Sequence, residues 1–471
     1  MNGSVLKIFN EIDKIPRSSG NEIEISNYVL NFAINLGLVA TRDEYNNVKV
    51  KKSAQGMKGE TIILQSHMDM VCVSEENSTH NFDIDPIEIL EEDGWITGKG
   101  TTLGADNGIG MAIMLAIMES KDVIHPDLEF IFTTDEERGL TGAANIALDD
   151  FNGKRLINLD GEEEGIFYVS CAGSMRAVLS KDVDLIEMNN KFRATKSIRL
   201  FNGNGGHSGL DIQKQNINAI QLMSRILKYI DSDDLYLHDF NGGGKENSIP
   251  TSTTILISIP CEIEVKVIEK LKEIMHIIKL EYPNEEKIEI SVENASDCKF
   301  AMSKIDKESL LNLLLTIPNG TQKINLNTGE ASLSNNIGTL RFDNNKIVIT
   351  NLLRSNEDST KIVLLDKINI LARSFDFNLS TYGDYQAWEY IYNSDLQKEI
   401  KKLYENSFGR QAQFHSIHAG LECAYFSKKR PEWDMISMGC NIENAHTTRE
   451  RLEIASVYRV YNFLLKLIKD I

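Results

Sequence analysis

The sequence has no long hydrophobic run. None of its apolar stretches approaches the roughly 20 residues that a membrane-spanning helix needs. Residues 1–7 also lack a basic region followed by an apolar stretch, which is the pattern of a secretory signal. Hydrophobic residues make up 42% of the chain and charged residues 25%, a balance typical of globular proteins in water. We therefore expect a cytoplasmic protein without a membrane partner.

Positive charge is scarce. The chain has 50 Lys and Arg residues against 69 Asp and Glu residues, and its net charge is −19. A field of this sign repels phosphate backbones, so nucleic acid is not an expected partner. Paired cysteines are missing too, because the six cysteines lie far apart, without the spacing of a thiolate zinc site or a disulfide framework. We expect reduced thiols.

The length of the chain, 471 residues, is too great for one hydrophobic core and predicts two or three domain-sized units. Helical stretches such as residues 108–118 separate several strand-like apolar runs. These runs are residues 61–65, 128–133, 156–159 and 434–438. The alternation predicts an α/β fold in which a central mixed sheet lies between helices.

The middle of the chain has a different texture. Between residues 185 and 382, charged segments rich in Ile and Lys alternate with Gly and Asn turns, and no cluster of acidic ligands occurs. Residues 249–259 have a strand pattern and residues 265–280 a helix pattern. We interpret residues 185–382 as an inserted α+β domain, which leaves residues 1–184 and 383–471 as two parts of a catalytic domain.

Five short segments of those two parts each place a candidate metal ligand just beyond an apolar run. The candidates are His67, Asp106, Glu137, Asp160 and His446. A lone His-x-Asp sequence says little, since a single histidine is more often a packed or surface residue than a ligand. Two imidazoles and three carboxylates exceed what one tetrahedral site needs. They predict two metal ions about 3.5–4 Å apart with one bridging carboxylate, at the strand ends where open α/β sheets bind ligands.

Two further carboxylates accompany these ligands. Asp69 follows His67 by two residues, so in an extended chain both side chains leave the same face and the carboxylate can orient the imidazole. Alternatively, Asp69 only caps the next turn. Glu136 adjoins Glu137, and adjacent carboxylates at a strand end are costly unless cations or protonation relieve them. One of the two can bind metal while the other acts as general base, although taken alone the pair could equally be a solvated loop.

Several stretches resemble a known family, the co-catalytic zinc peptidases, which include glutamate carboxypeptidases, aminoacylases, peptidase T and carnosinases. They are residues 15–22 (IPRSSGNE), 65–71 (QSHMDMV), 100–110 (GTTLGADNGIG), 160–165 (DGEEEG), 206–209 (GHSG) and 417–423 (IHAGLEC). Residues 101–110 and 418–423 are most similar to the branch of aminoacyl-histidine dipeptidases. The resemblance implies a di-zinc peptidase-like catalytic domain, with the inserted α+β domain as a lid.

The resemblance also implies the metals and their ligands. Two divalent ions are expected, zinc first, with manganese or cobalt as alternatives. Asp106 would bridge them. His67 and Asp160 would complete one site, and Glu137 and His446 the other.

Four residues outside the metal ligands are implied to act on the substrate. His207 of the lid would reach the developing oxyanion, within its own chain or across a homodimer formed through the lid. A turn histidine in a Gly-rich loop is its plain structural alternative. Asn247, Arg354 and His418 resemble substrate-binding positions.

Together these residues predict a metal-dependent hydrolase of dipeptides, Xaa-His and broadly others, whose partner is a small peptide. Glu136 would take a proton from the attacking water and deliver one to the leaving amine, while Asp69 would orient His67. The nearest alternative is an amidohydrolase of N-acyl amino acids, because the same centre could serve it, but only a dipeptidase must recognise a free ammonium group. A non-catalytic metal-binding or peptide-binding relative is the second alternative, and the presence of Glu136 counts against it.

Overall fold

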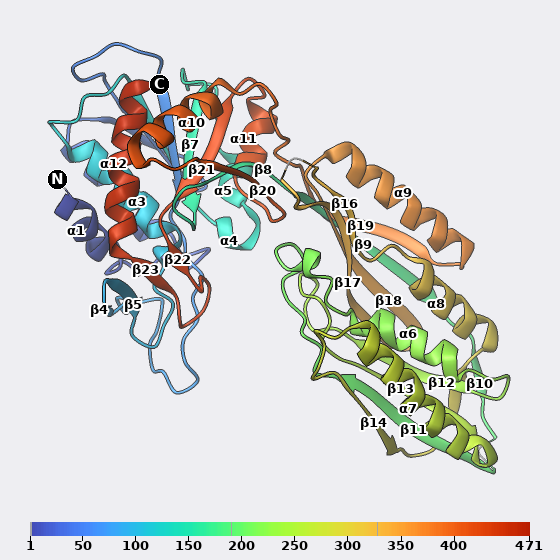
Figure 1. Cartoon of the computed structure of the whole chain (residues 1–471). Coiled ribbons are helices and arrows are strands. Elements are labelled where there is room, and N and C mark those ends of the chain that lie inside the picture. Colours follow the sequence, from blue (N-terminus) through green and yellow to red (C-terminus); the bar gives the residue numbers. More distant parts are fainter. Residues whose placement is uncertain (1, 190, 327) are drawn as a thin grey trace. The chain divides into compact units, whose positions relative to one another are not determined.

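Two compact units make up the protein, and the computed structural model describes residues 2–189, 191–326 and 328–471. Unit 1 comprises Met1–Cys171, Trp388–Ser416 and Leu421–Ile471. Unit 2 comprises Ala172–Ala387 and Ile417–Gly420. In Figure 1, unit 1 holds both ends of the chain, and unit 2 holds its green-to-orange middle.

The borders of unit 2 differ from the predicted residues 185 and 382. Strand β9 (Gly173–Asp182) already belongs to unit 2, because it pairs along its whole length with β18 (Lys346–Ser355). Strand β19 (Asn378–Tyr385) pairs with the other side of β9. The change in composition begins only after β9. Strand β9 has the alternating burial of any half-covered strand, so its sequence does not show to which unit it belongs.

The sheet of unit 1 is mixed and confirms the predicted α/β class. Its strand order is β1-β2-β6-β3-β7-β21-β8-β20, and β6, β3, β7 and β21 run parallel to one another. The bounds are β1 Val39–Arg42, β2 Val48–Lys52, β3 Ile62–His67, β6 Leu128–Thr133, β7 Arg155–Gly161, β8 Ile166–Cys171, β20 Gln413–Ile417 and β21 Asp434–Gly439. Strands β3 and β6 are buried at every residue, as expected where helices cover both faces.

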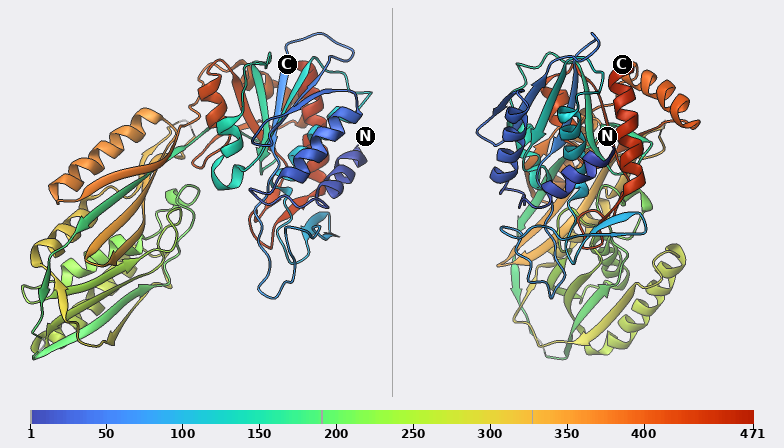
Figure 2. Two further views of the ribbon diagram at one scale, coloured as in Figure 1. Left: turned by 180° about the vertical axis from the view of Figure 1, so that it is seen from behind. Right: turned by 90° about the vertical axis from the view of Figure 1, so that its left-hand side faces the viewer.

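Helices lie on both faces of this sheet (Figures 1 and 2). Helix α3 packs on β3 and β7 and is itself covered by α1, so its side chains are apolar nearly all round. On the other face, α5 packs against α11. The bounds are α1 Asn2–Ile12, α2 Ile23–Asn35, α3 Ala105–Glu119, α4 Glu136–Gly139, α5 Thr141–Asn145, α10 Asp395–Phe408, α11 Cys423–Lys429 and α12 Ile454–Asp470.

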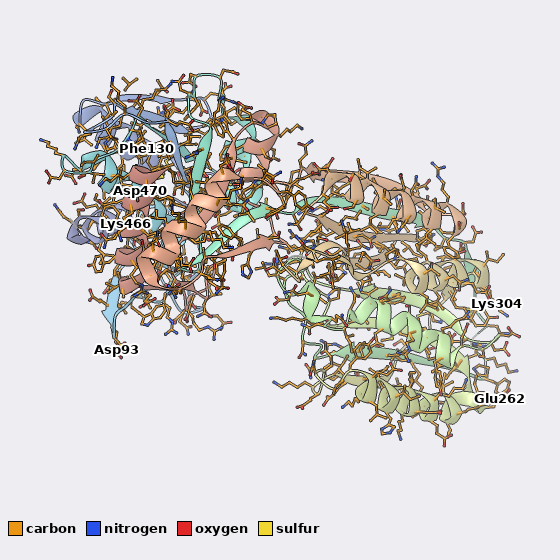
Figure 3. All side chains as sticks on the ribbon, turned by 45° about the horizontal axis from the view of Figure 1, so that its top comes forward. Asp93, Phe130, Glu262, Lys304, Lys466 and Asp470 are labelled. Atoms are coloured by element: carbon orange, nitrogen blue, oxygen red, sulfur yellow. The ribbon has the colours of Figure 1, made fainter. Side chains whose placement is uncertain are left out.

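A small antiparallel sheet in the order β22-β23-β5-β4 completes unit 1. Its strands are β4 Ile89–Glu92, β5 Trp95–Gly98, β22 Ile442–Glu443 and β23 Arg451–Glu453. Figure 3 draws side chains on the ribbon and labels Phe130 of β6, which is buried in unit 1, and the exposed charged residues Asp93 and Lys466. Within the described residues, no helix is long and apolar enough to cross a membrane.

Unit 2 is an α+β unit whose large sheet has the order β14-β11-β13-β12-β17-β18-β9-β19, with β16 paired to β17. Apolar residues from this sheet and from α6 to α9 form its own core. The remaining strands are β10 Leu185–Glu187, β11 Arg193–Phe201, β12 Tyr236–Gly242, β13 Thr253–Pro260, β14 Glu289–Asn294, β15 Phe300–Met302, β16 Gly320–Ile324 and β17 Ala331–Asp343. The helices are α6 Ala219–Ile230, α7 Glu264–Glu281, α8 Lys304–Thr316 and α9 Asp358–Ser374, with 3₁₀ turns at Ile212–Lys214 and Cys261–Ile263.

Candidate metal centre

The five predicted ligands all belong to unit 1 and lie near the carboxyl ends of its parallel strands. His67 is the last residue of β3, and Asp160 is the residue before the end of β7. Glu137 lies in α4, just after β6, and Asp106 lies at the start of α3. His446 follows β22 in a turn where its φ is 64°. Neighbouring parallel strands end at one edge of a sheet, so the fold itself gathers these side chains.

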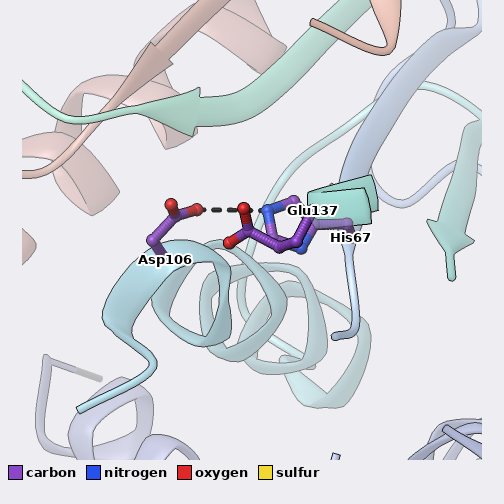
Figure 4. Close-up of side chains that lie close together, drawn as sticks. All are labelled: His67, Asp106 and Glu137. Atoms are coloured by element: carbon purple, nitrogen blue, oxygen red, sulfur yellow. Dashed lines mark hydrogen bonds and ion pairs between the residues drawn. The ribbon is translucent and has the colours of Figure 1, made fainter. Parts of the chain in front are cut away.

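Asp106 lies between the two histidines. Its Oδ1 atom is 3.1 Å from Nε2 of His67, and its Oδ2 atom is 3.0 Å from Nε2 of His446. Asp160 Oδ1 is also 3.1 Å from His67 Nε2, and Glu137 Oε1 is 3.1 Å from His446 Nε2. Figure 4 shows His67, Asp106 and Glu137, whose nearest ligand atoms all lie within 4.8 Å of one another. The Nε2 atom of each imidazole therefore faces Asp106 and one further carboxylate.

This set of donors fits two divalent cations. Glu137 Oε1 is buried beside His446 Nε2, and no other partner of this oxygen occurs among the described residues, so one cation could be shared by both groups. Imidazole nitrogens and carboxylate oxygens are ligands that zinc accepts, and three carboxylates offset most of the charge of two dications. His67, Asp106 and Asp160 would hold one ion, and Glu137, Asp106 and His446 the other.

Asp69 makes contacts that fit both of the roles predicted for it. Nδ1 of His67 lies 3.1 Å from the carbonyl oxygen of Asp69 and 3.5 Å from its carboxylate. That carboxylate also accepts hydrogen bonds from the backbone N–H groups of Glu136 (3.0 Å) and Glu137 (3.2 Å) and from Ser19 Oγ (2.7 Å). Burial alone would raise the pKa of Asp69, but these donors and His67 lower it. These contacts are compatible with both predicted roles, which are orienting His67 and capping the turn that carries the two glutamates.

Glu136 stands apart from its neighbour. Within the described residues no hydrogen bond or ion pair involves its carboxylate, whereas Glu137 lies beside His446. Burial raises the pKa of Glu136 well above its usual value. His67 opposes this shift, and the negative charges of Glu137 and Asp160 add to it. A general base must hold a proton after it has acted, and a raised pKa favours that protonated state.

Two buried carboxylates near the centre were not predicted from the sequence. Glu450 accepts hydrogen bonds from the backbone of residues 103–106, which lead to Asp106. Glu422 accepts one from Thr133 Oγ1 (2.7 Å) and one from Gln65, both close to ligand-bearing strand ends. Glu422 falls within the stretch 417–423 that resembles the family, and Glu450 lies four residues beyond His446. Only this closeness in sequence to predicted site residues could have indicated them.

The predicted substrate residues gather within unit 2. The residues around His207 and Asn247 pair, since the Ser208 N–H group donates to the Asn247 carbonyl at 2.9 Å. Nη2 of Arg354 lies 3.4 Å from Nε2 of His207. The carbonyl oxygen of His418 would lie only 2.2 Å from a Cβ atom at Gly209, so a glycine is required there. Unit 2 thus brings together all four residues that the sequence placed on the substrate side.

Arg354 and His207 present two hydrogen-bond donors to one place. Nδ1 of His207 accepts from the N–H groups of Gly209 (3.3 Å) and Leu210 (3.2 Å), so in the neutral ring Nε2 carries the hydrogen. The 3.4 Å contact between this Nε2 and Arg354 Nη2 then joins two donors and is not a hydrogen bond. Arg354 is buried, its Nε atom has no hydrogen-bond partner, and its surroundings include no carboxylate among the described residues. Burial lowers the pKa of Arg354. An anionic oxygen would satisfy both donors.

His418 is held differently. Its Nε2 accepts from Ser334 Oγ at 2.8 Å, and its Nδ1 donates to Asn356 Oδ1 at 2.9 Å. Burial, together with the nearby positive charges of Arg354 and His207, lowers its pKa to about 3. Because both ring nitrogens form hydrogen bonds, His418 helps to hold the loop Ile417–Gly420 in place. Contact of His418 with substrate stays a prediction.

Comparison with known proteins shows to which family the chain belongs. The model of peptidase family M20/M25/M40 matches residues 63–470, most of the chain. The chain belongs to this family. The matched range contains every proposed metal ligand of the M20-type centre, together with Glu136 and the four residues of unit 2.

Relatives of this M20 protein match nearly end to end. The cytosol non-specific dipeptidase of Escherichia coli (strain K12) is 33% identical over 470 residues, which cover 98% of this chain and 96% of the relative. The crystal structure of an aminoacylhistidine dipeptidase from Vibrio alginolyticus superposes with a TM-score of 0.89 at 31% identity, covering 99% of this chain and 96% of that one. A tripeptidase from Staphylococcus aureus shares the fold at a TM-score of 0.58 and 16% identity, covering 100% of this chain and 98% of its own.

Proposed function

We propose that the protein is a metal-dependent dipeptidase that hydrolyses Xaa-His and, more broadly, other dipeptides. One observation carries the proposal: the carboxylate of Asp106 lies between Nε2 of His67 and Nε2 of His446, and each of these atoms faces one further carboxylate. The carboxylate of Glu136 has no partner within the part of the chain that the structure describes. The family and the two relatives named as dipeptidases support the same activity. Non-catalytic binding of a metal would need the ligands but not Glu136.

The proposed cofactors are two divalent ions, with zinc first and manganese or cobalt as alternatives. Ions held by these ligands would polarise the scissile carbonyl and lower the pKa of a water molecule toward about 7. Glu136 takes the proton of the attacking water and passes it to the leaving amine. Asp69 keeps the ring of His67 and the start of α4 in place while this happens.

Recognition of the substrate falls to unit 2. A dipeptide at neutral pH ends in a carboxylate, and its hydrolysis develops a second negative oxygen at the scissile carbonyl. Arg354 is a buried cation with no carboxylate beside it in the described parts of the chain, so it suits the first of these charges, and His207 suits the second. We propose Asn247 as a further substrate contact, because its backbone pairs with the residue that follows His207.

The experiment that tests the proposal compares substrates. Metal-loaded protein is assayed against Xaa-His dipeptides, the same dipeptides with an acetylated amine, tripeptides and N-acetyl amino acids. We expect free dipeptides to be cleaved fastest, because acetylation removes the ammonium group that a dipeptidase must bind. Faster cleavage of N-acetyl amino acids would instead identify an amidohydrolase, and no cleavage of any substrate would leave a non-catalytic binding protein.

Location and assembly complete the proposal. We propose a cytoplasmic enzyme, supported by the name of the E. coli relative. We also propose that unit 2 acts as a lid and that a homodimer forms through it. Sedimentation or light scattering of the purified chain would measure the assembly directly.

A further inference from the structure

The segment that leads to Asp106 is held by a residue far away in sequence. Glu450 is buried, and its Oε2 atom accepts from the N–H groups of Leu103 (2.9 Å) and Gly104 (3.0 Å). Its Oε1 atom accepts from Ala105 (2.8 Å) and Asp106 (3.4 Å). Four successive backbone donors therefore converge on one carboxylate.

These four donors would otherwise have no partner. The backbone angles of Asp106 (φ −82°, ψ 107°) are not helical, and the first helical hydrogen bond runs from the Gly108 N–H group to the Gly104 carbonyl at 3.1 Å. The N–H groups before that point cannot bond within α3, and leaving them buried and unpaired is costly. The negative charge of Glu450 also suits the N-terminus of a helix.

Arg17 holds the same segment from another side. Its Nη2 atom donates to the Gly104 carbonyl and to Asp13 Oδ1, both at 2.8 Å. A Cβ atom at Gly104 would lie 2.6 Å from this nitrogen, and one at Gly108 would lie 2.7 Å from it, so the guanidinium fits tightly against the backbone. Arg17 and Asp13 are buried, so water does not replace these contacts.

Both residues also connect the Asp106 segment to other parts of the centre. Glu450 lies in the turn that follows His446, and its N–H group donates to the Thr447 carbonyl at 3.0 Å. The carbonyl of Arg17 accepts from the N–H group of Met70 at 3.1 Å, next to Asp69. Movement of the Asp106 backbone would therefore disturb more than one ligand.

We propose that Glu450 and Arg17 are positioning residues, which fix the backbone from Leu103 to Asp106 so that each oxygen of Asp106 faces its own metal ion. This inference rests on the proposed two-metal centre. Both oxygens of a bridging carboxylate are in use, so a small rotation that improves one contact weakens the other. Neither residue touches the ions or the substrate in this proposal.

The test measures metal binding by the full chain after complete removal of metal. Zn²⁺ is titrated against a chromophoric chelator at a temperature where circular dichroism shows each variant folded. Glu450→Gln should raise the dissociation constant of at least one ion about 10–100-fold, the usual effect of losing a residue that orients a ligand. Its Co²⁺-loaded form should also show an altered visible absorption spectrum, because the ligand geometry has changed.

Glu129 provides the matched control. It is a buried carboxylate of unit 1 that likewise accepts backbone N–H groups, from Asn152 and Gly153, at the opposite end of β6 from Glu137. Glu129→Gln should lower the melting temperature of the apoprotein yet leave both zinc constants and the Co²⁺ spectrum unchanged. Wild-type constants for Glu450→Gln, with only its melting temperature lowered as in Glu129→Gln, would overturn the proposal.

Two further variants keep the proposal falsifiable if Glu450→Gln does not fold. Glu450→Asp keeps the charge but is too short to reach all four donors. Arg17→Lys keeps the charge but replaces the guanidinium, whose Nη2 joins Gly104 to Asp13, with an ammonium of different shape. Each should raise the same zinc constant, by less than Glu450→Gln would. Unchanged constants in both variants would overturn the proposal, whereas fewer than two ions bound by the wild type would contradict the two-metal centre itself.

Discussion

Glu136 and Glu137 are neighbours in sequence with different surroundings. Glu137 faces His446, whereas the carboxylate of Glu136 has no hydrogen-bond or ion-pair partner among the described residues. We expect Glu136→Gln to keep both metal ions and to lose turnover by about 10²–10⁴-fold, the usual worth of a placed general base. Glu137→Gln should instead lower metal occupancy. Metal analysis and steady-state kinetics on the same preparations check this, and reversed phenotypes would exchange the two roles.

His207 gives a second prediction at the level of single residues. If Nε2–H stabilises a charge that exists only in the transition state, His207→Ala should lower kcat by about 10²–10³-fold and leave metal content unchanged. Arg354→Lys should mainly raise KM, since it keeps the charge but loses the planar guanidinium that can pair with both oxygens of a carboxylate. A His207→Ala variant with normal turnover per folded molecule and a lowered melting temperature would identify a structural histidine.

The chemistry of each side chain also determines whether its role in the site could be predicted from the sequence. The five candidate ligands were predicted because each of these side chains lies beside an apolar run, and the structure places them close together around Asp106. No role was predicted for Glu450 or Arg17. A carboxylate or guanidinium that hydrogen-bonds to the backbone does not occur at a characteristic distance in sequence from its partners. Only the fold shows which backbone groups it reaches.

At the level of elements, the loop Ile417–Gly420 should make stability depend on pH. The pKa of His418 falls to about 3 in the folded protein from an ordinary value of 6.5. As pH falls below about 6.5 the unfolded chain takes up this proton before the folded chain does, so His418 makes the folded state lose stability from pH 6.5 toward pH 3. Above pH 6.5 it has no such effect.

Urea unfolding of wild type and His418→Gln at pH 7 and pH 4.5 measures this effect. The variant should lose less unfolding free energy on acidification than the wild type does. His276→Gln, at an exposed position of α7, is the matched control and should behave as the wild type. Equal losses in wild type and His418→Gln would show that His418 is protonated in the folded state as readily as in the unfolded chain.

Elements were predicted well where pattern and length agreed. The predicted strand at residues 128–133 is β6, and the helix predicted at residues 265–280 is α7. The strand predicted at residues 249–259 begins only at Thr253 as β13, because Pro250 and the residues before it belong to the loop that pairs with His207. Local sequence cannot show that a loop is committed to a distant partner.

At the scale of the molecule, metal binding should stabilise one unit and not the other. All proposed ligands lie in unit 1, and a ligand that binds only the folded state stabilises it by about 2.7 kcal/mol at a concentration 100 times its dissociation constant. Removal of metal should therefore speed amide hydrogen exchange in unit 1 and leave the core of unit 2 unchanged. Hydrogen exchange with and without a chelator, and with His67→Ala as control, checks this prediction. Equal changes in both cores would contradict it.

The position of β21 in the sheet of unit 1 has a consequence for synthesis of the chain. Strand β21 lies between β7 and β8, yet it is made only after the whole of unit 2. At about 5–20 residues per second, the ribosome needs roughly 15–60 s to pass from the end of β7 to the end of β21. During that time the nascent chain carries an apolar, unpaired edge at β7, which is the kind of surface that pairs with other chains. Chaperone occupancy on ribosomes should therefore rise once β7 has emerged and fall only after residue 439.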